Sequence, residues 1–234
     1  MFIYHCPELP IRMRERIIDA LPRATGDSEA LTPVRREQFL VYLMGPYRTF
    51  DVDALLPADV DAEPETPSFA TWDESTGEYA EDEVLRLLQE TRDCLRERGF
   101  NAFLAIDVGI SLDEMDAATQ SIAFAQASNA SIFIAPQVGD NLGVGIEIGS
   151  VLEDLLSTAG MEGPAADATS VTRTRRVMVA TEPSVRSAML GAVNTRWDAS
   201  VRTFTDVADC CRLCAQFCTH IQNEELYGSL ERLD

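Results

Sequence analysis

The sequence predicts an α/β domain in which a five-stranded parallel sheet is covered by helices on both faces. Short, contiguous apolar runs alternate with longer segments whose apolar residues recur at helical spacing. Strand-like and helix-like segments follow each other in turn, which is the pattern of parallel sheets rather than of hairpins. A glycine-rich stretch at residues 136–145 separates one apolar run from the next helical segment, as in α/β proteins that bind a ligand at such a turn.

The first part of the chain predicts a helix, a strand and a long insert. Residues 11–21 form an amphipathic pattern that we expect to lie outside the main fold, and residues 38–44 form the first strand. Residues 49–80 are rich in acids and contain three prolines and no basic residue, so we expect a loop insert. The prediction is an N-terminal helical extension, residues 1–37, followed by a single α/β domain, residues 38–234.

The rest of the chain supplies the remaining elements in alternation. A helix over residues 81–98 has an apolar stripe and stops at Gly99. Helices expected after it span residues 113–127, 144–156, from 183 onward, and 206–226. The strands expected between these helices span residues 101–106, 131–135, 176–180 and 201–205. Each strand is a short apolar run bounded by polar or turn-forming residues.

The composition is strongly acidic, with a formal net charge of −20, and all 19 basic residues are Arg. Repulsion among like charges destabilises a compact chain at low salt, and molar salt relieves it by shortening the screening length to about 3 Å. We therefore expect a protein of an extremely halophilic cytoplasm. No basic cluster in the sequence could neutralise several phosphates, so a nucleic acid polymer is not an expected partner.

The sequence also predicts that the protein neither enters a membrane nor is exported. No stretch approaches the roughly 18 apolar residues that a membrane-spanning helix needs. Residues 1–16 have a broken apolar run and no small-residue cleavage site, so we expect no signal peptide and a cytoplasmic location.

Four of the six cysteines fall on one expected helix: Cys210, Cys211, Cys214 and Cys218. Cysteines that are neighbours on a helix point apart, so this spacing favours buried free thiols in a reducing compartment over a disulfide framework. The alternative is a metal site that joins this helix to His5 and Cys6. We expect no metal.

Three turns should meet at one edge of the sheet, because ligands of open α/β sheets bind at the carboxyl ends of the strands. The first follows residue 44 and reads Gly45-Pro46-Tyr47-Arg48, where Arg48 could hold a phosphate. The second contains Asp107, and the third leads through Gly143 and Gly145 to Glu147. The alternatives are that Glu147 only complements a helix N-terminus, that Arg48 pairs with acids of the insert, and that Asp107 is a solvated surface acid.

Two of these turns carry a family resemblance. V-Y-L-M-G-P-Y at residues 41–47 resembles the first strand and turn of nucleoside 2-deoxyribosyltransferases and the related nucleotide N-glycosidases. G-V-G-I-E-I-G at residues 143–149 is similar to their nucleophile turn, and the likeness extends over residues 38–156. The whole chain resembles an uncharacterised haloarchaeal protein of this type. The resemblance implies a flavodoxin-like sheet, no organic cofactor and a homodimer.

The resemblance also implies roles for residues. Glu147 would be the nucleophile that attacks the anomeric carbon of the sugar, and Tyr42 or Tyr47 would stand near it. Asn141 occupies the position where the family usually has an Asp, and Asp140 is one residue earlier. The family's base-contacting Asp falls at Ala123. We therefore expect a nucleoside or nucleotide as the partner, with N-glycosidic cleavage or exchange through Glu147, Asp140 and Asn141. The alternative is a non-catalytic nucleotide-binding or regulatory module of the same fold.

Overall fold

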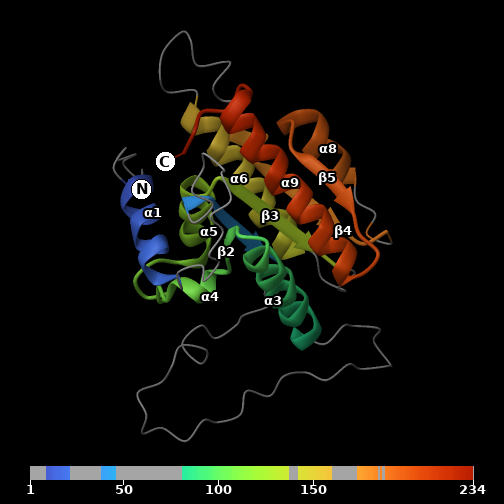
Figure 1. The fold of residues 1–234 in the computed structure, drawn as a ribbon, viewed down its shortest axis with the longest axis horizontal. Coiled ribbons are helices and arrows are strands. Elements are labelled where there is room, and N and C mark those ends of the chain that lie inside the picture. Colours follow the sequence, from blue (N-terminus) through green and yellow to red (C-terminus); the bar gives the residue numbers. More distant parts are fainter. Residues whose placement is uncertain are drawn as a thin grey trace, which may run out of the picture.

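The protein is described by a computed structural model that covers residues 9–21, 38–45, 81–136, 142–159, 173–183, 185 and 188–233. Its centre is a sheet in the order β2-β1-β3-β4-β5, with every neighbouring pair parallel (Figure 1). The strands are β1 (Leu40–Met44), β2 (Asn101–Phe103), β3 (Ala130–Ala135), β4 (Val177–Thr181) and β5 (Ser200–Thr203). This order is that of the flavodoxin-like fold, so the predicted fold class is confirmed.

Helices cover both faces of the sheet. On one face lie α3 (Glu81–Glu97) and α9 (Val207–Tyr227), which contact each other. On the other face lie α5 (Ala117–Ala127), α6 (Leu142–Ala159) and α8 (Ala188–Trp197). The helices α1 (Leu9–Ala20) and α4 (Ala105–Val108) lie beside α5 (Figure 1).

The strands divide their side chains between two cores because successive residues of a strand point to opposite faces. In β1, Tyr42 and Met44 join the core under α5 and α6, whereas Val41 and Leu43 join the core under α3 and α9. The inner strands β1, β3 and β4 are buried along their whole length, which explains their contiguous apolar runs. The edge strands are short, three residues in β2 and four in β5.

The sequence pattern suggested a helix outside the main fold, but the N-terminal helix α1 packs into one of the two cores. Met13, Ile17 and Leu21 are spaced by four residues and are buried in the same core as β1 and α5. Arg14 on the same helix is 7% exposed and donates hydrogen bonds to the carbonyl oxygens of Ala127, at 2.7 Å, and Gln38. The guanidinium therefore satisfies backbone acceptors where the apolar face of α1 docks.

A buried polar network closes the amino end of the sheet. The guanidinium of Arg176, at the start of β4, forms an ion pair with Glu225 of α9, and both side chains are less than a tenth exposed. Asn129, just before β3, donates its amide to both carboxylate oxygens of Glu225, at 3.0 and 3.2 Å. The side-chain oxygen Oδ1 of Asn129 accepts the backbone N–H of Leu40 at 2.9 Å. The starts of β1, β3 and β4 are thus fastened to α9.

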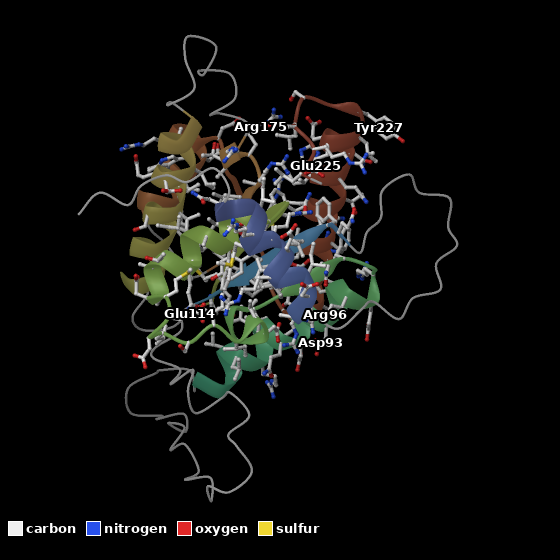
Figure 2. All side chains as sticks on the ribbon, turned by 90° about the vertical axis from the view of Figure 1, so that its left-hand side faces the viewer. Asp93, Arg96, Glu114, Arg175, Glu225 and Tyr227 are labelled. Atoms are coloured by element: carbon white, nitrogen blue, oxygen red, sulfur yellow. A yellow bond between two sulfur atoms is a disulfide. The ribbon has the colours of Figure 1, made fainter. Side chains whose placement is uncertain are left out.

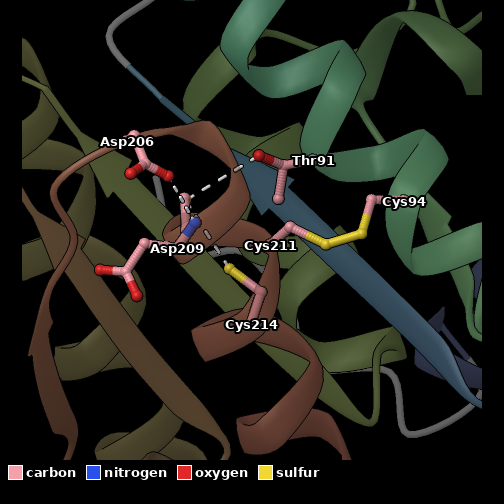
Figure 3. Close-up of a disulfide and its surroundings, with 7 residues drawn as sticks. Thr91, Cys94, Asp206, Asp209, Cys211 and Cys214 are labelled. Atoms are coloured by element: carbon pink, nitrogen blue, oxygen red, sulfur yellow. Dashed lines mark hydrogen bonds between the residues drawn. A yellow bond between two sulfur atoms is a disulfide. The ribbon is translucent and has the colours of Figure 1, made fainter.

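A disulfide between Cys94 and Cys211 joins α3 to α9, with the two Cα atoms 6.3 Å apart (Figure 3). The expectation of free thiols is therefore wrong for Cys211 and right for Cys210, Cys214 and Cys218, which are buried and unbonded. The spacing of cysteines along one helix gives information only about partners within that helix. The partner of Cys211 lies on α3, across the contact between α3 and α9. The contact with Cys210 and burial raise the pKa of Cys214, and burial raises that of Cys218, so these two remain protonated.

Among the described residues, no group of three or more His, Cys, Asp or Glu side chains could hold a metal ion. His5 and Cys6, which the alternative metal site would need, lie outside the described residues. Within the same described ranges, no helix is long and apolar enough to cross a membrane.

We expect Glu225→Gln to lower the free energy of unfolding by about 3–5 kcal/mol, because it leaves the buried guanidinium of Arg176 without its counter-charge. Glu153→Gln is the matched control, since Glu153 pairs with Arg196 at the surface and such pairs contribute at most about 1 kcal/mol. Urea unfolding at constant KCl measures both variants. Equal losses in the two would contradict a special role for the buried network.

The disulfide makes a prediction for thiol chemistry. In denaturant without a reductant, an alkylating reagent should modify Cys210, Cys214 and Cys218 but neither Cys94 nor Cys211. After reduction the reagent should modify all five of these cysteines. The Cys94→Ser substitution should make Cys211 reactive without reduction. Peptide mass mapping reads the result. Label on Cys94 or Cys211 in the unreduced protein would show that the two sulfurs are not bonded.

Candidate functional site

The carboxyl ends of β1 and β3 meet at the point where the order of the strands reverses. The chain leaves β1 through α3, on one face of the sheet, and leaves β3 through α6, on the other. The two strands are direct neighbours, and Met44 at the end of β1 pairs with Phe133. Open α/β sheets bind ligands at such a switch point, where two connections diverge. This position holds the turns that begin with Gly45 and with Pro136.

Gly45 has a packing role at this position. A Cβ atom built on Gly45 would lie 2.9 Å from Cδ1 of Leu88 and 3.2 Å from the carbonyl oxygen of Ile134. Leu88 is fully buried in α3, and Ile134 belongs to β3. A side chain here would therefore push α3 away from the sheet, and the absence of one lets the helix pack closely.

Tyr42 lies in the core rather than at the mouth of the crevice. Its ring is stacked against Phe103, with centroids 5.3 Å apart, and contacts the edge of Phe124 at 5.4 Å. The side chain is 2% exposed. The three rings form one aromatic cluster between β1, β2 and α5, and such contacts stabilise a core beyond simple area burial. A ligand could reach Tyr42 only if these neighbours moved.

Asp107 is not brought to the meeting point of the three turns. β2 ends at Phe103, which pairs with Tyr42, so it stops two residues short of the end of β1. The expected strand over residues 101–106 is therefore wrong in its second half, where α4 begins. The carboxylate of Asp107 accepts the backbone N–H of Leu104 at 2.9 Å, which caps this helix and ends the strand.

Both carboxylate oxygens of Asp107 are also paired with arginines of α3. Oδ1 accepts from Arg92 at 2.8 Å and Oδ2 from Arg96 at 3.2 Å. Burial lowers the pKa of Arg92, but the carboxylates of Asp93 and Asp107 outweigh it and leave that pKa raised. For Arg96 burial prevails and the pKa is lowered. Asp107 thus holds β2 and α4 against α3, and both its oxygens have cationic partners.

The helix that carries Glu147 begins earlier than the sequence suggested. α6 starts at Leu142, so Gly143 and Gly145 lie inside its first turn rather than in the preceding loop. Glu147 is the sixth residue, in the second turn, and the first turn contains no acid. The helix includes both residues despite the weak helical preference of glycine, which costs about 1 kcal/mol per residue. The N-terminal dipole falls off within one turn, so it does not account for Glu147.

The other predicted site groups lie outside the described residues. These are Pro46, Tyr47 and Arg48 after β1, Asp140 and Asn141 before α6, and the side chain of Glu147. Ala123, at the position of the family's base-contacting Asp, lies in α5 and is buried at 6% exposure. The nearest acid before it in the chain, Asp116, caps α5 by accepting the N–H of Thr119 at 3.0 Å. The hydroxyl of Thr119 and this N–H lower the pKa of Asp116.

A cavity of about 280 Å³ opens at the carboxyl edge of the sheet. Its apolar wall comes from Val84 and Leu87 of α3, Phe204, and Val207 of α9, and Pro136 lies at the end of β3. We name this space the carboxyl-edge cavity. Its polar lining is Arg86, Glu182 and Asp206. None of the three stands out in the sequence pattern, although Glu182 directly follows β4, just as Asp107 directly follows the strand expected over residues 101–106.

We expect Gly45→Ala to lower the free energy of unfolding by about 1–3 kcal/mol, because the new methyl group overpacks Leu88 and Ile134. Gly149→Ala is the control: it lies in α6, and its added Cβ would meet no described atom within 4 Å. This control should gain up to about 1 kcal/mol from helical propensity. Thermal unfolding compares the two variants. A Gly45→Ala variant as stable as the wild type would contradict the packing explanation.

Comparison with known proteins adds a family but no function. No curated protein and no solved structure matches the chain. A family model does match, over residues 14–234, from the first turns of α1 to the last residue. Because this match covers nearly the whole chain, the protein belongs to the family described as Domain of unknown function (DUF7509).

Proposed function

We propose that the protein binds a nucleoside or nucleotide over the carboxyl ends of β1 and β3, and that Glu147 acts on its N-glycosidic bond. The observation that carries this proposal is the direct pairing of β1 with β3 at the reversal of strand order. The end of β1 with its turn, and the first turns of α6, are the two stretches that carry the family resemblance. Their strands are neighbours, as one shared ligand site requires.

The proposed reaction needs two groups. The carboxylate of Glu147 attacks the anomeric carbon, the C–N bond breaks, and a proton donor protonates the leaving base. The resulting glycosyl ester is released by water in a hydrolase, or by a second base in a transferase. Asp140 is the proposed proton donor, and Asn141 beside it can only donate or accept hydrogen bonds.

The start of α6 supports the binding of a phosphate or sugar oxygen. The first four N–H groups of a helix have no partner within the helix, and they attract anions. Gly143 and Gly145 belong to this first turn of α6 and carry no side chain. In this proposal a nucleotide phosphate approaches these amides, and Arg48 of the neighbouring turn supplies the counter-charge.

The second candidate is a nucleotide-binding or regulatory module without catalysis. The environments of two polar groups favour it. Asp107 has both carboxylate oxygens paired with arginines, and Tyr42 is 2% exposed. Neither is available to assist proton transfer in this arrangement. Asn141 and Ala123 stand where nucleoside 2-deoxyribosyltransferases have acids, and these two replacements also favour a module without catalysis.

We further propose that the protein acts as a cytoplasmic homodimer without an organic cofactor. The support is the family resemblance, in which a second copy completes the site. Sedimentation equilibrium in molar KCl tests the dimer, and a monomer at micromolar concentration would contradict it.

The enzymatic proposal predicts that free base appears when the protein is incubated in molar KCl with deoxynucleosides or their monophosphates. Glu147→Gln should abolish this release, because an amide cannot form the glycosyl ester. Glu153→Gln on the same helix should release base at the wild-type rate, since Glu153 is exposed and forms a surface ion pair with Arg196. Chromatography measures the base.

Two other outcomes decide between the candidates. Release that persists in Glu147→Gln would remove Glu147 as the nucleophile. A ligand that raises the unfolding temperature of the wild type without any release supports the binding module.

A further inference from the structure

A second hollow lies between β5 and the C-terminal half of α9, away from the carboxyl-edge cavity. Its volume is about 520 Å³, within the range of small-molecule sites. Asp198 and Ala199 line it immediately before β5, and Arg175 lines it just before β4. It therefore opens toward the amino end of the sheet, on the side that carries Arg175, Glu225 and Tyr227 (Figure 2). We name it the β5–α9 groove.

The groove arises because β5 is an edge strand that α9 covers only in part. Val201 packs toward the core of α6 and α8, so Ser200 and Arg202 face the α9 side of the sheet. The most extensive contacts of α9 with the sheet are to β3 and β4. The strip of β5 beyond them stays open, and Arg202 is exposed there.

The cations in the groove fall into two kinds. Arg175 is engaged, with Asp198 at 3.7 Å, Glu224 at 4.0 Å and the hydroxyl of Ser229 at 3.2 Å. The side chains of Arg202 and His220 form no hydrogen bond or ion pair with other described residues, and both residues are exposed. In a chain with a net charge of −20, acids outnumber bases about two to one, so an arginine that faces a groove without an acid partner is unusual.

The remaining lining supplies one more donor and an apolar surface. Gln216 lies one helical turn before His220 on α9, so their side chains share a face. Leu213, Phe217 and Leu230 provide the apolar wall. The donors available to a ligand are thus a guanidinium, an imidazole and a carboxamide beside an apolar surface. A phosphate has three oxygens for such donors, and arginine binds phosphate with two parallel hydrogen bonds.

We propose that the β5–α9 groove binds a small phosphate monoester with an apolar body. Its phosphate lies between Arg202, His220 and Gln216, and its body lies on Phe217 and Leu213. The site is separate from the proposed nucleotide site at the carboxyl ends of the strands, and no bond of the ligand is broken here. Arg175 also lines the groove, but its guanidinium is held by Asp198 and Glu224.

Phenyl phosphate is the probe, and the imidazole of His220 is the reporter. The chain contains only two histidines, so a proton NMR spectrum shows two imidazole environments, and His220→Gln identifies the resonance of His220. At constant KCl, phenyl phosphate should shift this resonance in a saturable way. Arg202→Gln should weaken the affinity on the order of tenfold, as expected for one lost charge-assisted contact.

Arg16→Gln is the control, because it also removes one arginine charge, but Arg16 lies on α1, pairs with Glu114 and does not line the groove. It should leave the affinity unchanged. Phenol should bind far more weakly than phenyl phosphate. Benzoate that binds as well as phenyl phosphate would overturn the assignment to phosphate.

A shift of the His5 resonance alone, or binding that is insensitive to Arg202→Gln, would overturn the proposal. Base release by Glu147 is measured in a separate assay, so the two proposals can fail independently.

Discussion

The buried ion pair between Arg176 and Glu225 is the constraint on which the geometry of the sheet depends. Each partner alone would be an uncompensated charge in a nearly dry environment, and that is far more costly than an unmade surface contact. Asn129 extends the pair to the start of β3 and to the backbone of β1. The starts of three parallel strands, β1, β3 and β4, are therefore held next to one another. Because parallel strands have the same direction and nearly the same rise per residue, holding their starts also determines where their carboxyl ends lie.

The inner strands were predictable because burial on both faces leaves a signal in the sequence. β1, β3 and β4 are contiguous apolar runs, and the structure places each within one or two residues of its expected bounds. β2 was predicted too long, because Leu104 and Ile106 continue an apolar pattern. The carboxylate of Asp107 ends the strand by binding the N–H of Leu104, and one acid at such a position does not stand out in a chain with 39 acidic residues.

The candidate site was less predictable than the fold, because its residues depend on contacts across the chain. Asp107 follows a strand and looked like a ligand-facing acid, but its partners Arg92 and Arg96 belong to the preceding helix, which packs over it. Glycines at residues 143 and 145 indicated a turn, whereas the structure includes them in α6. The pairing of Cys94 with Cys211 spans 117 residues and leaves no local pattern. In each case the decisive neighbour is distant in sequence.

The brevity of β2 and β5 has a consequence for how readily copies of the chain would associate in concentrated salt. Long range repulsion between copies is screened there, so a net charge of −20 gives little protection against association. A sheet edge with unpaired backbone groups is a template for another chain to add a strand. With three residues at one border and four at the other, and with the guanidinium of Arg202 on the longer one, neither border offers a run long enough for stable intermolecular pairing. Colloidal stability in brine would then come from backbone geometry rather than from charge.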